Sequence, residues 1–426
     1  MSHFKVLNFL IRALKKHENI TLFSSTIFPV CLQIPQCRCP TFLNMPVSND
    51  LILSTALAFC DWSAKHKTRR DMLRSHTFPR PSAPRWSTLD STLTAELAEF
   101  SKNLEAASAS GSPVALKPLL LHTCASTFMG YFCGRRFPKG HAKFEQMIVN
   151  FDKVFYEVNQ GYAADFLPWL NPLHTRHLEQ LNQWSHQIRE FITTEIIADR
   201  TPGVVGGEMT DYVDDLLANV YSGSDNSLDL ESALFALEDI IGGHSAVANF
   251  LMKIIALIVR RPDIQNRIRE EAATVAPGTI PIPSRVPYTE AVLLEGLRLI
   301  SSPIVPHVAN QDNSIAGYPV AEGSLIFLNN YELNMNPELW SEPEKFNPER
   351  FLSASGEVRQ PEYFIPFGGG RRSCMGYKMV TILGIAVISA MFSDFEVGPA
   401  PSVDYTVAPG SLALPWDTYS FAVNRR

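Results

Sequence analysis

Apolar residues recur at three- and four-residue spacing along most of the chain after about Thr92, which is the period of amphipathic helices. The stretches in which this period is clearest are residues 119–132, 144–158, 178–197, 264–275 and 289–300. The pattern therefore predicts a protein built mainly from helices.

The longest apolar run covers residues 228–261 and predicts one helix long enough to cross a whole domain. Two arginines and a proline at 260–262 suit the end of that helix. Gly242 and Gly243 interrupt the run, at a cost of about 1 kcal/mol each relative to alanine. Two interpretations account for the pair: another helix approaches closely there, or a flat ligand lies against the backbone.

The period changes between residues 303 and 327, where alternating residues and Gly/Pro pairs predict short strands and hairpins. Residues 334–366 are rich in Pro, Asn and Glu and have little periodicity, which indicates a long ordered loop. A second apolar helix is predicted over 377–392. The expected fold class is therefore mainly α with small β-sheets, of the α+β type.

Composition narrows the possible functions. The chain has 426 residues, of which 46% are hydrophobic and 19% charged, as in a globular protein rather than a disordered one. A net charge of -6 provides no basic stripe for nucleic acid, so a small molecule is the expected partner. The 7 cysteines are odd in number and scattered, which fits a reducing compartment. Cys37 and Cys39 lack the second pair that a zinc site needs.

Membrane attachment is left open by the pattern. No stretch has the roughly 18 consecutive apolar residues of a spanning helix. The first twenty residues mix Lys and Arg with Phe, Leu and Ile, which is typical of a membrane-surface or transit segment. An ordinary solvated helix is the other interpretation, and we favour it slightly.

Candidate chemistry gathers in the stretch Phe367-Gly-Gly-Gly-Arg-Arg-Ser-Cys374-Met-Gly376, which runs directly into the helix predicted over 377–392. A cysteine ionises more readily beside arginine and at a helix N-terminus, where backbone N–H groups favour negative charge. The glycines permit a tight turn and a close approach to a flat cofactor. The stretch therefore favours a metal-binding thiolate, and a buried free cysteine in a turn is the alternative.

The same stretch resembles the haem-binding signature of the cytochrome P450 family at Phe367, Gly370, Arg372, Cys374 and Gly376, with no departure. The resemblance implies haem b between the long central helix and the cysteine loop, with Cys374 as the axial ligand of the iron. It also implies O2 and electrons from NADPH, delivered by a reductase or a ferredoxin. The expected location is the endoplasmic reticulum membrane, with the mitochondrion as the alternative.

Three charged residues agree with this family. Glu295 and Arg298 are three apart on a predicted helix and share one face, and Arg350 is a candidate to complete a buried charge network. They are similar to the Glu-x-x-Arg pair and downstream arginine that hold the cysteine loop in the family. An exposed helical pair, worth only about 0.3–0.5 kcal/mol, is the alternative.

Candidate partners of the haem propionates also follow from the resemblance. Arg372 is the best candidate, and His307 occupies the place where many members present such a residue. Trp62, with Arg69 and Arg70 expected further along the same helix, is similar to the propionate-binding helix. The departure there is His66, which stands where an arginine is common.

The segment expected above the iron departs further from the family pattern. Gly242-Gly243-His244-Ser245-Ala246 aligns with (Ala/Gly)-Gly-x-(Asp/Glu)-Thr, so Ser245 replaces the acid and Ala246 the threonine. That pair normally delivers protons to bound dioxygen, and Ala246 has no proton to give. We therefore hypothesise oxygen activation assisted by the substrate, with Ser245, His244, water or a substrate hydroxyl as proton sources. His244 is also interpretable as a packed histidine.

Three short segments, Gly242-Gly-His-Ser-Ala-Val247, Cys60-Asp61-Trp62 and the cysteine stretch from Phe367 to Gly376, together resemble the insect Halloween enzymes of the spook type. This resemblance implies a sterol substrate in ecdysteroid hormone synthesis. The resemblance covers residues 56–426, the expected catalytic domain, and leaves 1–55 as an atypical N-terminal segment without the usual membrane anchor. Two alternatives remain: a haem-thiolate isomerase or dehydratase that needs no external electrons, and an inactive haem-binding protein.

Overall fold

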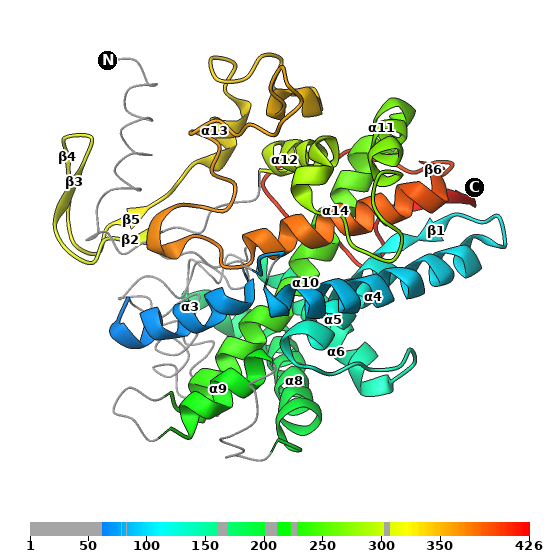
Figure 1. The fold of residues 1–426 in the computed structure, drawn as a ribbon. Helices are drawn as coiled ribbons and strands as arrows, with labels where there is room; N and C mark the ends of the chain where they lie inside the picture. Colours follow the sequence, from blue (N-terminus) through cyan, green and yellow to red (C-terminus); the bar gives the residue numbers. More distant parts are fainter. Residues whose placement is uncertain are drawn as a thin grey trace.

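The computed structural model describes residues 62–77, 79–81, 83–160, 168–200, 211–222, 228–301 and 307–426. Several sequence predictions lie outside these residues: the amphipathic first twenty residues, the Cys37/Cys39 pair and the boundary between 55 and 56. The element labels below follow Figure 1.

The central element is α10 (Leu230–Ile258), the 29-residue helix that the longest apolar run predicts. It begins at Asp229, whose side chain accepts a hydrogen bond from the backbone N–H of Ser232, as an N-cap residue does. The helix α5 (Leu116–Phe132) packs along it (Figure 1). A Cβ atom at Gly243 would lie 3.2 Å from the Phe128 ring of α5, so this glycine permits close helix packing.

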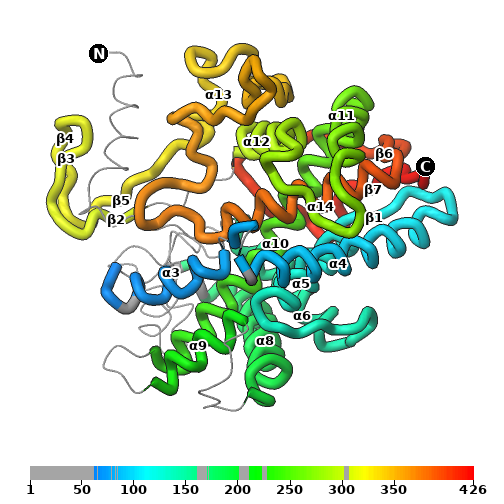
Figure 2. Tube along the Cα trace, in the orientation of Figure 1, coloured from blue at the N-terminus to red at the C-terminus, as the bar shows by residue number. Residues whose placement is uncertain are grey.

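Helices account for most of the described chain, and the predicted fold class is confirmed (Figure 2). The remaining α-helices are α3 (Ala64–Thr77), α4 (Pro84–Ser108), α6 (Ala142–Val158), α8 (Thr175–Phe191), α9 (Tyr212–Val220), α11 (Pro262–Ala272), α12 (Pro287–Ile300), α13 (Asn330–Met335) and α14 (Tyr377–Asp394). Shorter helical segments are η2 (Pro168–Leu173), η3 (Ile192–Ile197), η4 (Pro283–Arg285), η5 (Pro348–Phe351) and η6 (Gly370–Arg372).

Two helical boundaries differ from the sequence pattern. Helix α3 precedes Thr92 and α4 begins eight residues before it. Polar residues dilute the apolar period of both, although Pro84 at the first position of α4 is a local helix-start signal. The run 178–197 is helical throughout, but its last part is the π-helix η3. A π-helix changes which residues share a face, so a simple period does not reveal it.

The described strands form three small antiparallel sheets. The strands predicted between 303 and 327 are confirmed as β2 (His307–Val308) paired with β5 (Leu325–Ile326), and β3 (Asn313–Ile315) paired with β4 (Tyr318–Val320). The β3–β4 hairpin extends away from the helices in Figure 1, and Tyr318 is 71% exposed there. The third sheet, which the pattern does not predict, has the order β1 (Val114–Ala115), β7 (Ser420–Arg425), β6 (Phe395–Pro399).

The region 334–366 is irregular apart from the end of α13 and the short η5, as predicted. Aromatic side chains hold it against α12: Trp340, Phe351 and Phe364 form one buried cluster with Ala291 and Leu294. The loop therefore has its own apolar core, which ends only a few residues before the cysteine loop.

Two helices, α10 and α14, are long and apolar enough to cross a membrane by length and composition. In the structure, 83% of the apolar window of α10 and 61% of that of α14 are buried inside the protein. The sequence prediction that no stretch has the needed length is therefore corrected, because isolated polar residues interrupt α10 without lowering its mean hydropathy much. Both helices contribute to the core.

Candidate functional site

The cysteine loop is a tight turn that ends at the first residue of α14. Gly368 and Gly370 have φ values of 73° and 68°, a left-handed backbone that favours glycine. The loop closes on itself through a hydrogen bond of 2.9 Å from the backbone N–H of Cys374 to the carbonyl of Phe367. These contacts fix Cys374 at the N-terminus of α14.

The Cys374 sulfur has electropositive neighbours. Burial raises the pKa of the free thiol, whereas backbone N–H donors from Gly376 and Tyr377 and the charge of Arg70 lower it. A Cβ atom at Gly376 would lie 3.9 Å from the sulfur, so the helix start lies close to it. The buried neutral thiol therefore has donors in place for an anionic sulfur, the form that binds a metal.

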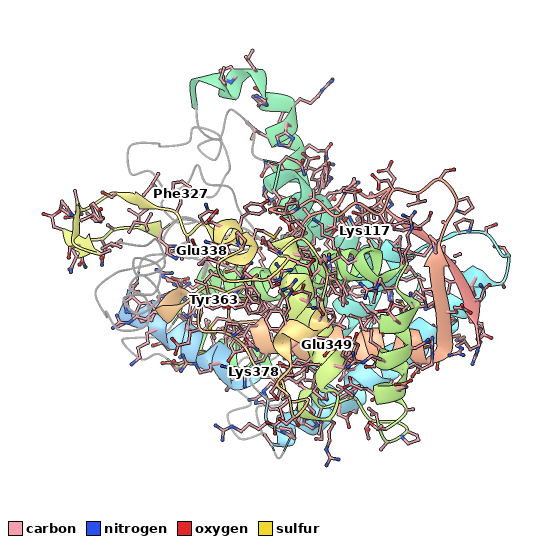
Figure 3. The ribbon with its side chains drawn as sticks, turned by 90° about the horizontal axis from the view of Figure 1, so that it is seen from above. Lys117, Phe327, Glu338, Glu349, Tyr363 and Lys378 are labelled. Atoms are coloured by element: carbon pink, nitrogen blue, oxygen red, sulfur yellow. The ribbon has the colours of Figure 1, made fainter. Side chains whose placement is uncertain are left out.

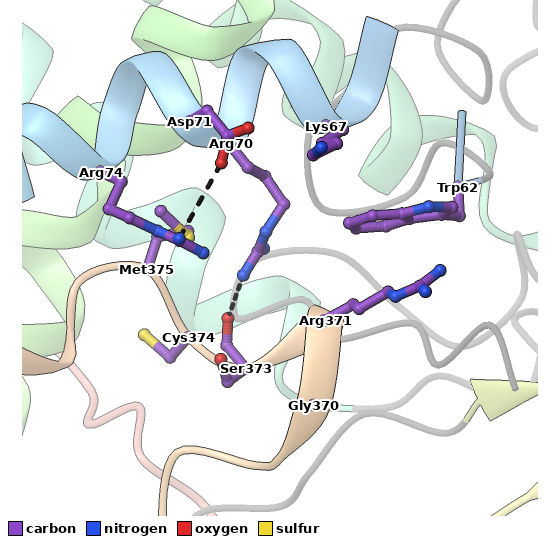
Figure 4. Close-up of a pocket in the computed structure, with 10 residues that line it drawn as sticks. All are labelled: Trp62, Lys67, Arg70, Asp71, Arg74, Gly370, Arg371, Ser373, Cys374 and Met375. Carbon is purple, nitrogen blue, oxygen red and sulfur yellow. Dashed lines mark hydrogen bonds and ion pairs between the residues drawn. The ribbon is translucent and has the colours of Figure 1, made fainter. Parts of the chain in front are cut away.

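Arg70 ties α3 to the cysteine loop. Its Nη2 donates a hydrogen bond of 2.8 Å to the carbonyl of Ser373, as Figure 4 shows. Burial and the neighbouring Arg372 lower the pKa of Arg70 to about 10, so it stays charged at neutral pH. Both arginines and Cys374 therefore belong to one electrostatic unit.

A cavity of about 250 Å³ opens beside the sulfur. Cationic side chains dominate its polar lining, with one acid among them (Figure 4): Lys67, Arg70, Arg74, Arg371 and Asp71. Figure 4 also shows the Trp62 ring at its edge, 5.1 Å from the guanidinium carbon of Arg371. This side of the cysteine loop is therefore strongly positive.

Three basic side chains are buried where α3 meets the loop: His66, Arg69 and Arg372 are 0%, 3% and 2% exposed. Nη1 of Arg372 lies 3.2 Å from Nε2 of His66. Trp62 contacts His66 edge-on, with ring centroids 5.1 Å apart, but it lies before the first residue of α3 rather than within that helix, which corrects the sequence expectation. Buried cations in one corner favour an anionic ligand there.

His307, the other propionate candidate, is buried on β2 with 1% exposure. It is paired with Ile326 of β5 in the backbone register.

Glu295, Arg298 and Arg350 come together in a buried network. Arg298 donates two hydrogen bonds of 2.8 Å to the two carboxylate oxygens of Glu295, and both side chains are 0% exposed. Arg350 donates to the same carboxylate at 3.3 Å. Arg298 also donates to the carbonyls of Asn334 and Pro343, each at 2.7 Å.

The network reaches the cysteine loop through packing. Arg298 lies 5.2 Å from the Trp340 ring, which contacts Phe364 at a centroid distance of 6.0 Å. Phe364 lies only three residues before Phe367, where the cysteine loop begins. The charged residues therefore fix the irregular segment that leads into the loop.

On α10, His244 and Ser245 are buried, whereas Gly243 and Ala246 are partly exposed. His244 Nδ1 lies 2.6 Å from the carbonyl of Ile241, and its ring packs edge-on against Phe151. Burial lowers the pKa of His244 to about 4, so the imidazole is neutral at pH 7. The Ser245 hydroxyl lies 3.4 Å from His244 Nε2. The packed interpretation of His244 fits this geometry.

The comparisons with known proteins agree with the family resemblance of the cysteine loop. A family model described as cytochrome P450 matches residues 46–421. The chain belongs to the cytochrome P450 family, and the prediction of a P450 enzyme is confirmed at that level.

Individual relatives match different shares of this chain. Cytochrome P450 307a1 of Drosophila melanogaster is 35% identical over 401 residues, which are 88% of this chain and 74% of the fly protein. Cytochrome P450 2U1 of Homo sapiens is 30% identical over 276 residues, 61% of this chain and 50% of that protein. Farnesoate epoxidase of Bombyx mori is 28% identical over 277 residues, 62% of this chain and 56% of its own length. The fly relative agrees with the predicted resemblance to the spook-type insect enzymes.

The residues present fit haem. Cys374 supplies one thiol with N–H donors around it, and the buried basic side chains of His66, Arg69 and Arg372 suit the two carboxylates of the macrocycle. Among the described residues there is no group of three or more His, Cys, Asp or Glu side chains able to hold a metal ion without such a cofactor. A single thiolate as the protein ligand is consistent with both observations.

Sequence reasoning missed two buried lysines, Lys117 on α5 and Lys253 on α10, which are 1% and 2% exposed. Each interrupts a helix of otherwise mostly apolar residues. A lone cation in such a stretch is the signal that points to a specific buried partner.

Proposed function

We propose that this protein is a haem-thiolate monooxygenase that uses O2 and NADPH-derived electrons to oxidise a sterol in ecdysteroid hormone synthesis. The observation that carries the proposal is the position of Cys374 at the start of α14, between backbone N–H donors and Arg70. The spook-type resemblance and the 35% identity to the fly protein support the insect sterol pathway.

In this proposal Cys374 would bind the haem iron through its thiolate, and Arg372, His307 and Trp62 would hold the propionates. Gly242, Gly243, His244, Ser245 and Ala246 would form the part of α10 that faces the bound haem. When bound, haem supplies the activation of dioxygen. The protein's own part is to bind, orient and exclude water, because a buried apolar helix lies on one side and the glycine loop on the other.

Proton supply is the unusual element. Ala246 has no hydroxyl, Ser245 faces His244, and the lowered pKa of His244 leaves it without an acidic proton at pH 7. Water or a hydroxyl of the substrate is therefore the proposed proton source, and the substrate takes part in its own oxidation.

The cationic cavity beside Cys374 supports an acidic electron-donor protein as the partner, because opposite charges steer association. We assign this role to NADPH-cytochrome P450 reductase, at the endoplasmic reticulum membrane. A ferredoxin would take its place if the protein is mitochondrial.

The spectrum of the reduced, carbon monoxide-bound protein tests the central claim. A thiolate-ligated haem gives a diagnostic Soret band in this state, and Cys374→Ala should abolish it. A variant that keeps the same band would overturn the proposal. Titration of the ferric protein with sterols then tests the substrate class.

A haem-thiolate isomerase or dehydratase is the second candidate, favoured by the absence of a hydroxyl at Ala246. Electron demand separates the two. Sterol conversion without a reductase and NADPH supports the second candidate, whereas strict dependence on both supports the monooxygenase.

A further inference from the structure

Residues 408–415 form an irregular segment between β6 and β7 in sequence, exposed at both ends and buried at two residues near its end. Ala413 and Leu414 are each 7% exposed. The segment belongs to no described strand or helix. One backbone hydrogen bond of 2.9 Å, from the N–H of Gly410 to the carbonyl of Ile300, ties it to the end of α12, and side chains from the neighbouring helices supply the other contacts described below.

Lys117 of α5 is the first of these side chains. Its ammonium donates to the carbonyl of Leu414 at 2.7 Å, to that of Pro415 at 3.2 Å and to Asp152 at 2.7 Å. An ammonium has three N–H groups, so all of its donors are used. Burial lowers the pKa of Lys117, and the charge of Asp152 on α6 offsets part of this effect. Figure 3 shows Lys117 within the helical body, far from the hairpin side where Phe327 is labelled.

Asn249 of α10 is the second. Its Nδ2 donates to Asp152 at 2.9 Å and to the carbonyl of Ser245 at 2.8 Å. Its Oδ1 accepts the backbone N–H of Leu414 at 3.0 Å. If the amide were rotated by half a turn, Nδ2 would face the N–H of Leu414 and Oδ1 would face the two acceptor oxygens. The three contacts therefore fix one orientation of the amide.

Lys253, also on α10, is the third. Its ammonium donates to the carbonyl of Ser411 and, at 3.3 Å, to that of Ala408. These hydrogen bonds cross from the helix to the earlier half of the same segment. Two buried ammoniums and one amide therefore hold residues 408–415, together with the backbone hydrogen bond of Gly410.

The side chains that hold the segment continue the stripe of α10 that carries Ala246. Gly242, Ala246, Asn249 and Lys253 follow one another at steps of four, three and four, so they lie along one side of the helix. Ala246 and Asn249 are about 4.5 Å apart along the axis at the usual helical rise. The segment fixed by Asn249 therefore passes within one turn of Ala246.

We propose that Lys117, Asn249 and Lys253 are positioning residues that hold segment 408–415 as a fixed apolar wall of the substrate site. This inference rests on the proposed function, in which the part of α10 around Ala246 would face the bound haem. Because the donors that hold this wall are all engaged in hydrogen bonds, the wall does not move to fit a ligand. It therefore selects rigid, bulky, largely apolar molecules by shape. Substrate size discrimination is then set by polar residues that never touch the substrate.

The test compares two azoles that bind ferric haem through nitrogen, imidazole and the bulky clotrimazole, by their spectral shifts. In Asn249→Leu, clotrimazole affinity should fall about tenfold, equivalent to 1.4 kcal/mol, while imidazole affinity stays within about twofold. Lys253→Met is the second variant, because it removes a buried charge without leaving a carboxylate unpaired. It should change the same ratio in the same direction.

Gln265→Leu is the matched control. Gln265 is a buried amide that donates to the carbonyls of Ile258 and Val397, each at 3.0 Å, away from the segment. The control should leave the clotrimazole-to-imidazole ratio unchanged, and hydrogen exchange of 408–415 should rise only in the two test variants.

An unchanged ratio in Lys253→Met overturns the inference, even if Asn249→Leu does not fold. A change of equal size in Gln265→Leu also overturns it, because the effect would then reflect general loosening. If the unaltered protein shows no haem spectrum and no azole shift, the proposed function itself fails, and this inference fails with it.

Discussion

Arg70 of α3 donates a hydrogen bond to the carbonyl of Ser373, the residue that precedes Cys374. One cation therefore positions the loop backbone and stabilises negative charge on the sulfur. This hydrogen bond couples α3 to the cysteine loop, two elements that are far apart in sequence. Its contribution can be measured as a change in haem affinity.

Replacing Arg70 by Met removes both effects. We expect haem affinity to fall about tenfold, because a hydrogen bond to a charged group is worth about 1.5–3 kcal/mol. Haem transfer to apomyoglobin measures this change. Arg74→Met on the same helix is the control, since the Arg74 side chain is 64% exposed and its ion pair with Asp71 spans 4.0 Å. Equal haem loss in both variants would contradict the role of Arg70.

Ala246→Thr restores the hydroxyl that the family pattern places above the iron. If the substrate or water supplies the protons, product formed per NADPH consumed should change by less than about twofold. The measurement is the amount of product formed per NADPH oxidised. Hydrogen peroxide is measured as well, because it accounts for electrons that reduce dioxygen without forming product. A large rise in yield would show that the missing hydroxyl limits the reaction.

Glu295→Gln should destabilise the fold strongly. It leaves the guanidinium of Arg298, which is 0% exposed, without its carboxylate, and losing one partner of a buried pair costs about 3–5 kcal/mol. Urea unfolding followed by tryptophan fluorescence measures the loss. Glu342→Gln removes a carboxylate that is 62% exposed and pairs with Lys345, and it should have no measurable effect.

His244 should make the protein sensitive to acid. Its folded pKa of about 4 lies below the ordinary value of 6.5, so the unfolded chain binds a proton that the native chain does not between these values. Stability is therefore lost as pH falls from 6.5 to 4, by about 3 kcal/mol from this group.

His244→Gln should remove that part of the pH dependence. The measurement is the difference in unfolding free energy between the variant and the unaltered protein at pH 7 and at pH 4.5. His186→Gln, at an exposed position on α8, is the control. A difference that does not vary with pH would contradict a neutral buried imidazole.

The sequence predicted the parts of the molecule whose signals are local. The cysteine loop has glycines, arginines and a helix start within ten residues, and α10 has a long apolar period despite its two glycines and isolated polar residues. The network of Lys117, Asp152 and Asn249 could not be predicted, because nothing in the spacing of residues brings three separate helices and a late segment together. Only the lone lysines in apolar helices signal buried partners.

The third sheet was missed for a related reason. Its strand β1 has only two residues, Val114 and Ala115, which is too short for any alternation to appear. The pairing of Val114 with Phe421 joins opposite ends of the described chain. Such pairs depend on the helices that bring them together rather than on local preference.

The third sheet also determines when its strands can pair during synthesis of the chain. Among the described strands, β7 lies between β1 and β6 and is the one neighbour that either has, so this sheet cannot form until residues 420–425 are available. Val114 and Ala115 leave the ribosome long before then, and their backbone groups must wait unpaired while the intervening helices are made. Closure of the sheet is therefore a late step in folding, because its pairing joins residues about 300 positions apart in sequence.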